Sequence, residues 1–337
     1  MIDLQTRYKF TSFTFVLSLI EKIFNINDET DFNSVALEVF NFQYQNTAIY
    51  RSYIDLVNSK KIEHYLDIPF LPIQFFKSSK VIAKKHSIEK IFQSSGTTQN
   101  IRSQHHIHNL DLYKKSFKMG FKNLYSDISE WTVLALLPSY LEQGDSSLIY
   151  MVNHFIEKGT SESRYIDFNF DSIKSLSDKL RDKKVLLIGV TYALLDIAEK
   201  GSIDLKNWVI METGGMKGRR KEIIRNELHK QLMSSFNVDF IHSEYGMTEL
   251  LSQAYSKGNG VFTTPPWMKI IVRDFEDPFT YKRPRLSGGV NIIDLANIYS
   301  CSFIETQDIG KELNNEEFEI LGRFDNSEVR GCNLLSF

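Results

Sequence analysis

The chain has 337 residues, of which 42% are hydrophobic and 13% aromatic, a composition that excludes a disordered or fibrous protein. Its 40 Lys and Arg side chains are balanced by 42 Asp and Glu side chains, which leaves a formal net charge of −2. This balance provides no whole-chain field that would hold nucleic acid or an anionic membrane. We therefore expect no nucleic-acid partner.

Cysteine usage and hydropathy indicate the compartment. Cys301 and Cys332 form neither a CxxC pair nor a disulfide framework, which fits a reducing cytoplasm. No run of about 18 apolar residues occurs, and the short N-terminal apolar segment lacks a small-residue cleavage site. We expect a cytoplasmic protein without a signal peptide and without integral membrane association.

Residues 1–90 are expected to form a helical N-terminal flank, broken at Pro69 and Pro72, because proline lacks an amide hydrogen and fixes φ. Apolar residues at helical spacing near the N-terminus predict an amphipathic helix that packs on a globular core. They are Phe13, Val16, Leu17, Ile20, Ile23 and Phe24.

Residues 91–260 are expected to form an α/β nucleotide-binding core. Apolar runs over residues 131–137, 185–190 and 208–211 are typical of strands that are buried on both faces of a mostly parallel sheet. A helix is predicted over residues 221–236, because apolar residues recur there at every fourth position. The repeating residues are Ile224, Leu228, Leu232 and Phe236.

Another apolar strand is predicted to begin at Val238 and to run into a polar turn. Residues 261–337 are expected to form a smaller β-rich region, with strands over residues 269–273 and 290–294. The alternation of strands and helices that precedes it favours an α/β architecture.

A small, hydroxyl-rich turn precedes a predicted helix, in the stretch Phe92-Gln-Ser-Ser-Gly-Thr-Thr-Gln-Asn-Ile-Arg102. Gly96 permits close approach of a ligand to the backbone, and Arg102 offers a charged fork to phosphate oxygens. Hydroxyl donors come from Ser94, Ser95, Thr97 and Thr98. The pattern differs from a Walker-type P-loop, and an ordinary helix-capping turn has a similar composition. We interpret the turn as a candidate polyphosphate site.

A second stretch, residues 238–249, is a predicted strand that ends in polar residues. Ligands gather at the carboxyl ends of strands in open α/β sheets. There Glu249 could ligate a hard cation, and Thr248 could donate to phosphate. The ordinary alternatives are a solvated carboxylate at Glu249 and a structural histidine at His242.

A third stretch contains Asp308, which could accept hydrogen bonds from ribose hydroxyls, and Arg323, which could contact ribose or phosphate. Each could equally be a surface turn residue. The nucleotide interpretation is favoured because three separate stretches agree on one ligand.

In order and spacing, these stretches resemble the motifs of the adenylate-forming superfamily. Ser95-Gly-Thr-Thr98 is similar to its phosphate loop, Tyr245-Gly-Met-Thr-Glu249 to its YGxTE motif and Thr306-Gln-Asp308 to its TGD motif. Gly322-Arg-Phe-Asp325 is similar to the GRxD hinge, and Met211-Glu-Thr-Gly-Gly215 to the Gly-rich strand end that lies against adenine. The resemblance spans residues 92–325 and implies an α/β fold like the N-terminal domain of these enzymes.

The resemblance implies ATP and Mg²⁺ as cofactors, with Glu249 on the metal and Arg102 among the catalytic residues. Gln99 departs from the usual Gly of the phosphate loop, and Arg102 stands where the family often has Lys. The implied nucleotide contacts are Ser94, Ser95, Gly96, Thr97, Thr98, Gly214, Gly215, Tyr245, Gly246, Thr248, Asp308 and Arg323.

The sequence ends soon after Arg323, where most members continue into a mobile C-terminal lid domain, and Arg330-Gly-Cys-Asn-Leu334 places a cysteine near the end. In these respects it resembles the acyl-protein synthetases, the fatty-acid-activating component of the bacterial luciferase fatty acid reductase complex. This resemblance implies that no lid domain follows. It also implies activation of a long-chain fatty acid to acyl-AMP, transfer of the acyl group to Cys332 as a thioester, and delivery to a partner reductase.

Two other functions remain open. One is a small carboxylate–coenzyme A ligase similar to phenylacetate ligases. The other is a catalytically weak acyl-binding or scaffold protein that retains the fold, for which Gln99 is the support in the sequence. For Cys332, the alternative to a nucleophile is a small buried thiol.

Overall fold

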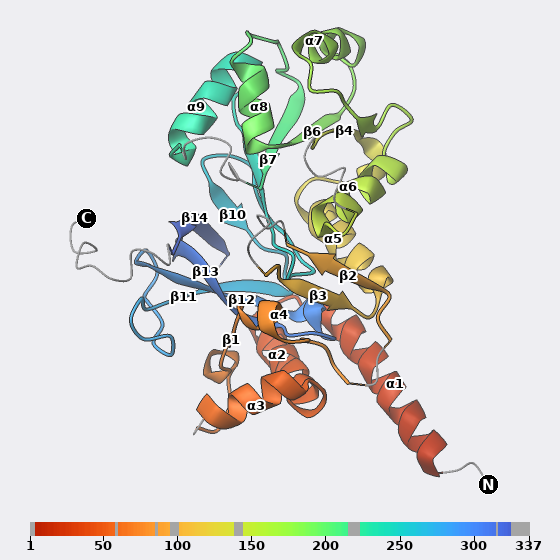
Figure 1. Cartoon of the computed structure of the whole chain (residues 1–337), viewed down its shortest axis with the longest axis vertical. Coiled ribbons are helices and arrows are strands. Elements are labelled where there is room, and N and C mark those ends of the chain that lie inside the picture. The colour runs from red at the N-terminus through yellow and green to blue at the C-terminus, as the bar shows by residue number, and fades with distance from the viewer. Residues whose placement is uncertain are drawn as a thin grey trace.

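The computed structural model describes residues 4–57, 60–84, 87–94, 101–137, 144–214, 223–314 and 316–324, with side chains from residue 14 onward. Helices dominate its N-terminal part, at the lower end of the molecule in Figure 1. The elements there are α1 (Leu4–Phe24), α2 (Glu29–Asn46), α3 (Ala48–Val57), η1 (Tyr65–Asp67), β1 (Leu71–Pro72) and α4 (Phe75–Ser78).

The expected N-terminal amphipathic helix is α1, and Val16, Ile23 and Phe24 are buried on its packed face. The ring of Phe24 lies 4.8 Å from the ring of Trp267, so this end of the helix packs on the β-rich part of the chain. The prediction for Leu17 was wrong, because its side chain is 46% exposed. Leu19 is buried instead, since it lies three residues after Val16 and residues three apart on a helix share a face.

A single 12-stranded mixed sheet contains most strands of the described chain, in the order β11-β12-β13-β14-β10-β9-β8-β7-β6-β4-β5, with β1 paired to β13. Five strands form its parallel part. They are β4 (Thr132–Leu136), β5 (Arg164–Tyr165), β6 (Val185–Val190), β7 (Trp208–Thr213) and β8 (His242–Tyr245).

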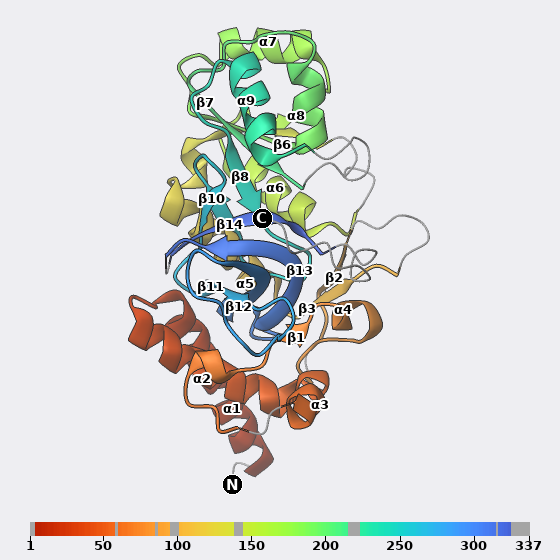
Figure 2. The same ribbon diagram turned by 90° about the vertical axis from the view of Figure 1, so that its left-hand side faces the viewer.

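The rest of the large sheet is antiparallel apart from the β1–β13 pair, and it curves between the N-terminal helices and the parallel part (Figure 2). Its strands are β9 (Ala254–Ser256), β10 (Val261–Thr263), β11 (Met268–Arg273), β12 (Ser287–Asp294), β13 (Phe303–Glu312) and β14 (Glu317–Arg323). A separate hairpin joins β2 (Lys90–Gln93) to β3 (Gln104–Ile107).

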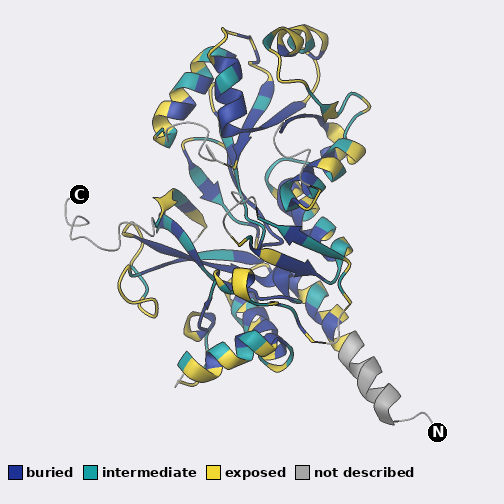
Figure 3. Cartoon of the chain, in the orientation of Figure 1, coloured by how far each residue is buried: buried dark blue, intermediate teal, exposed yellow. Residues whose placement is uncertain are grey.

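Helices cover the parallel strands on both sides. In Figure 1, α8 and α9 lie on one side of β6 and β7, while α5 and α6 lie on the other. Strands β4 and β6 are buried along their whole length (Figure 3), which is why their sequences are apolar apart from Thr132 at the start of β4. The helical segments are α5 (Leu110–Leu124), η2 (Ile128–Glu130), α6 (Ser147–Lys158), α7 (Phe170–Lys179), α8 (Thr191–Ala198), α9 (Arg225–Phe236) and η3 (Leu295–Asn297).

The strands expected over residues 131–137, 185–190, 208–211, 269–273 and 290–294 are confirmed as β4, β6, β7, β11 and β12. The helix expected from residue 221 is α9, which begins at Arg225. Residues 221 and 222 lie outside the described residues. Ile224, the first residue of the apolar repeat, occupies the N-cap position and is 77% exposed, while Leu228, Leu232 and Phe236 are buried.

The strand predicted from Val238 was placed too early, because β8 consists of the more polar residues His242–Tyr245. The chain turns at Asn237, whose φ of 51° is left-handed and ends α9. The amide of Val238 then donates to the carbonyl oxygen of Met233, so this apolar residue covers a helix end. Among the described helices, none is both long enough and apolar enough to cross a membrane.

Candidate active site

Tyr245, Asp308 and Arg323 meet at the junction of β8, β13 and β14. The hydroxyl of Tyr245 donates a 2.7 Å hydrogen bond to Oδ2 of Asp308, and Nε of Arg323 lies 3.1 Å from Oδ1. Asp308 and Arg323 are directly opposite each other in the β13–β14 pairing. Burial raises the pKa of Asp308, while Tyr245 and Arg323 act in the opposite direction. The three residues belong to three separate predicted motifs, and two of them, Tyr245 and Arg323, contact the carboxylate of the third, Asp308.

A buried guanidinium supports the backbone that leads into Asp308. Arg273 donates to the carbonyl oxygens of Val290 at 2.9 Å and Thr306 at 2.8 Å. Gly289 makes room for it, because a Cβ at that position would lie 2.5 Å from the guanidinium carbon. Sequence reasoning missed Arg273, which ends a predicted strand. The Gly288-Gly289 pair was the available signal, since paired glycines in a strand indicate close approach of another group.

Glu249 is the candidate metal ligand, and its side chain is buried. Burial raises the pKa of its carboxyl group, and the Ser103 hydroxyl, Arg323 and Lys77 only partly offset this effect. Within the described residues no group of three or more metal-binding side chains occurs. Mg²⁺ in nucleotide sites is bound by one or two carboxylates together with substrate phosphates. A single buried, poorly compensated carboxylate beside a phosphate-loop candidate fits Mg²⁺ of this kind.

Hydrogen bonds between Ser94 and Ser103 join the two ends of the candidate phosphate loop. The amide of Ser94 donates to the carbonyl oxygen of Ser103 at 3.1 Å, and the amide of Ser103 donates to Oγ of Ser94 at 3.0 Å. Arg102 is partly buried and immediately precedes Ser103. Residues Ser95, Gly96, Thr97, Thr98, Gln99, Gly215 and Cys332 lie outside the described residues.

Gly214 follows β7 with a φ of 75°, a conformation that favours glycine. Just before it, Oγ1 of Thr213 donates a 2.5 Å hydrogen bond to Glu244 on the neighbouring strand β8. Burial raises the pKa of Glu244 to about 7. Gly246 allows this placement, because a Cβ there would lie 2.5 Å from Oε1 of Glu244. Sequence reasoning did not single out Glu244.

A second carboxylate, Glu212, lies near the end of β7 and accepts a 2.9 Å hydrogen bond from Oγ1 of Thr191. Burial would raise the pKa of Glu212, but His229 and Arg225 together with the Ser243 hydroxyl lower it below its usual value. Glu212 and Glu244 therefore have opposite pKa shifts although both are largely enclosed. Arg225, His229 and the Ser243 hydroxyl outweigh burial at Glu212, whereas the Thr213 hydroxyl does not outweigh it at Glu244.

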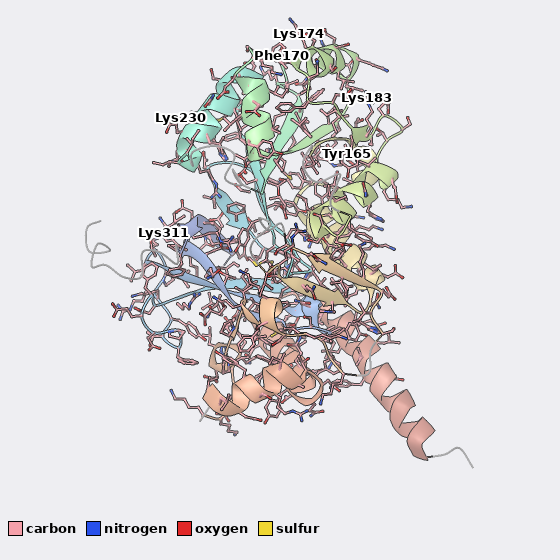
Figure 4. The ribbon with its side chains drawn as sticks, in the orientation of Figure 1. Tyr165, Phe170, Lys174, Lys183, Lys230 and Lys311 are labelled. Carbon is pink, nitrogen blue, oxygen red and sulfur yellow. The ribbon has the colours of Figure 1, made fainter. Side chains whose placement is uncertain are left out.

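His242 lies beside a tyrosine. Its Nδ1 is 3.0 Å from the hydroxyl oxygen of Tyr125, and burial lowers its pKa to about 4. Figure 4 shows the labelled Lys174, Lys183 and Lys230 in the part of the molecule opposite the N-terminal helices.

No protein-family model and no curated protein sequence matches the chain. Solved structures do. MatB from Rhodopseudomonas palustris bound to ATP has a TM-score of 0.52 and 16% identity over 70% of this chain and 48% of that chain. An open conformation of a 2-hydroxyisobutyryl-CoA ligase in complex with 2-HIB-AMP and CoA has a TM-score of 0.62 and 10% identity, covering 89% of this chain and 77% of that one.

A long-chain-fatty-acid-CoA ligase from Archaeoglobus fulgidus has a TM-score of 0.51 and 14% identity over 72% of this chain and 52% of that chain. The chain spans about half the length of this ligase and of MatB. Likeness at these identities concerns the fold. The chain has a mixed α/β fold with a large sheet and flanking helices that matches the N-terminal domain of adenylate-forming enzymes, as expected from its motifs.

Proposed function

We propose that the protein uses ATP and Mg²⁺ to convert a carboxylic acid into an acyl-adenylate, with release of pyrophosphate. The observation that carries this proposal is the carboxylate of Asp308, which accepts a hydrogen bond from Tyr245 and forms an ion pair with Arg323. It lies in a fold whose solved examples include ATP-bound and acyl-AMP-bound ligases.

In the proposed step a carboxylate oxygen attacks the α-phosphorus and the bond to pyrophosphate breaks. The acid is already ionised at neutral pH, so no general base is required. Asp308 would accept from a ribose hydroxyl, sharing Oδ1 with Arg323. Arg102 and the hydroxyls of the loop that Ser94 and Ser103 close would hold the leaving pyrophosphate, where negative charge develops. Mg²⁺ held by Glu249, when bound, neutralises charge on the phosphate oxygens.

We propose a long-chain fatty acid as the carboxylate. An open cavity of about 580 Å³ lies beside β8 and is lined by Leu124, Phe240 and Val261 together with polar and charged residues, among them Lys257 and Glu317. Its volume is within the range of about 300–1,000 Å³ that is usual for small-molecule sites. One of the fold neighbours is itself a long-chain-fatty-acid-CoA ligase, which supports the same substrate class.

The acyl acceptor that we propose is Cys332. Its thiolate sulfur would attack the adenylate carbonyl, form a thioester and release AMP, and a reductase cysteine would then take the acyl group. The other cysteine is poorly suited to this role. Cys301 is buried, burial raises the pKa of its thiol to about 12, and its Sγ donates to the carbonyl oxygen of Phe303.

A carboxylate–coenzyme A ligase is the second candidate function. It is favoured by the fold neighbour that holds both an acyl-AMP and CoA. The two candidates share the first half-reaction and differ in the acceptor. Release of AMP that depends on coenzyme A would favour this candidate over Cys332.

The proposal is tested by the exchange of labelled pyrophosphate into ATP across a panel of carboxylic acids of increasing chain length. We expect exchange that depends on Mg²⁺ and on an added acid, with long-chain acids giving the highest rate. Exchange with short acids alone would contradict the fatty-acid proposal. Absence of acid-dependent exchange across the whole panel would contradict adenylation.

A further inference from the structure

Two buried side chains hold the two peptide groups on either side of Glu249. Nδ1 of His105, on β3, lies 2.8 Å from the carbonyl oxygen of Thr248. Nδ2 of Asn297, in η3, donates to the carbonyl oxygen of Glu249 at 2.8 Å. The side chain of Glu249 leaves the Cα atom between these two planar groups. Fixing both groups therefore fixes the direction of the Cα–Cβ bond from which the carboxylate side chain extends.

The hydrogen-bond partners define how each of these side chains is oriented. Nδ2 of Asn297 also donates to the carbonyl oxygen of Cys301 at 2.9 Å, so its amide nitrogen faces two acceptors and its Oδ1 faces Nε2 of His105. A carbonyl oxygen only accepts, so the bond to Thr248 requires the ring proton on Nδ1.

A third side chain holds the residues that follow Glu249. Oδ2 of Asp294 accepts from the amides of Leu251 at 2.7 Å and Ser252 at 2.9 Å, and Oδ1 accepts from the Ser252 hydroxyl at 2.6 Å. Asp294, His105 and Asn297 are each at most 1% exposed. Their donors and acceptors come from β3, the end of β12 and η3, so the segment is held by elements that fold around it.

We propose that His105 and Asn297 are positioning residues that aim the Glu249 carboxylate at the metal of a bound metal–ATP complex. This inference rests on the proposed function. Groups that orient metal ligands typically contribute about 10-fold to 100-fold in metal affinity. Without His105 the segment would retain the bonds of Asp294, so the loop would stay folded while Glu249 loses its fixed direction.

The experiment measures ATP binding by calorimetry with excess Mg²⁺ and with EDTA, in variants whose melting temperatures show that they are folded. The ratio of the two dissociation constants is the metal gain. We expect His105→Leu to reduce this gain by about 10-fold, with ATP binding in EDTA changed less than about twofold. His105→Asn should restore most of the gain, because its amide nitrogen has the place of Nδ1.

Asn297→Asp is the second variant, because its carboxylate cannot donate to the carbonyl oxygens of Glu249 and Cys301. It should also lose metal gain, and it tests the proposal if His105→Leu does not fold. The matched control is His154→Asn, which changes a half-buried histidine of α6, and it should bind ATP like the wild type.

Unchanged metal gain in folded His105→Leu or Asn297→Asp would overturn the proposal. So would an equal loss of ATP binding with and without Mg²⁺, which is what a merely structural role predicts. A wild-type protein without metal gain would overturn it as well. Failure of the proposed function would be seen in a different assay. The wild-type protein would then bind metal–ATP but exchange no pyrophosphate into ATP with any acid.

Discussion

The hydroxyl of Tyr245 donates a 2.7 Å hydrogen bond to Oδ2 of Asp308, which connects β8 to β13 across 63 residues of sequence. Burial raises the pKa of Tyr245 well above its usual value, so the phenol keeps its proton and remains a donor. The bond in turn lowers the pKa of Asp308 against the effect of burial. The bond thus favours the ionised form of the carboxylate, which is the form that accepts from ribose hydroxyls.

Tyr245→Phe should weaken ATP use without unfolding the protein. Loss of one hydrogen bond to a charged group costs about 1.5–3 kcal/mol, and the carboxylate of Asp308 would be easier to protonate. We expect the KM for ATP in the exchange reaction to rise several-fold and the urea midpoint of unfolding to fall. An unchanged KM for ATP in the folded variant would remove this bond from the nucleotide site.

Glu249→Gln should abolish most adenylation while leaving the fold intact. Burial raises the pKa of Glu249 because the ionised form is poorly compensated in the free protein, so a neutral amide of equal size should not destabilise it. Adenylate formation and the melting temperature are measured together. A variant with the wild-type melting temperature and the wild-type rate would show that Glu249 is not a metal ligand.

Glu244→Gln should change how stability depends on pH. Burial raises the pKa of Glu244 to about 7 from an ordinary 4.5, so between these values the folded protein binds a proton that the unfolded chain releases. The stability contributed by the protonated group is complete below about pH 4.5 and is lost as the pH rises through about 7.

Glutamine does not titrate, so this part of the decline should be absent from the variant. The free energy of unfolding is measured in urea at several pH values across this window. The wild type should lose more stability than Glu244→Gln as the pH rises. Parallel curves for the two proteins would contradict the assigned pKa.

Cys332→Ala should preserve acid-dependent pyrophosphate exchange and abolish covalent labelling of the protein by a radioactive acid. Attack on the α-phosphorus needs no thiol, whereas a thioester does. Cys301→Ala is the matched control and should keep both activities. The prediction would be contradicted if Cys332→Ala still acquired label that neutral hydroxylamine releases while Cys301→Ala did not. That result would show that Cys332 is not the nucleophile.

Much of the core could be predicted from sequence because β4, β6 and the first part of β7 are largely buried and therefore mostly apolar. Strand β8 was misplaced because the apolar Val238 lies at the end of α9, where its amide donates to Met233, while the polar residues His242–Tyr245 make the strand pairing. Its polar side chains have partners in three dimensions, as when Thr213 bonds Glu244. A period-two or apolar pattern does not contain that information.

Short sequence motifs predicted Tyr245, Asp308 and Arg323 as candidate site residues. His105 and Asn297 could not be found in this way. They are 192 residues apart, and each looks like an ordinary polar residue of a strand or a short turn. Only the fold shows that both side chains contact the backbone carbonyl oxygens on either side of the Glu249 Cα atom. Buried polar side chains are paired with partners that can be distant in sequence, and the sequence does not show which partners these are.

The transfer of oxygen from substrate to nucleotide tests the central claim most directly. A carboxylic acid labelled with ¹⁸O in its carboxyl group is incubated with the protein, ATP, Mg²⁺ and an acyl acceptor, and the nucleotide product is analysed by mass spectrometry. Because the carboxylate oxygen attacks the α-phosphorus and leaves with it, we predict AMP that carries one ¹⁸O atom. Unlabelled AMP, or ADP as the acid-dependent product, would contradict the acyl-adenylate.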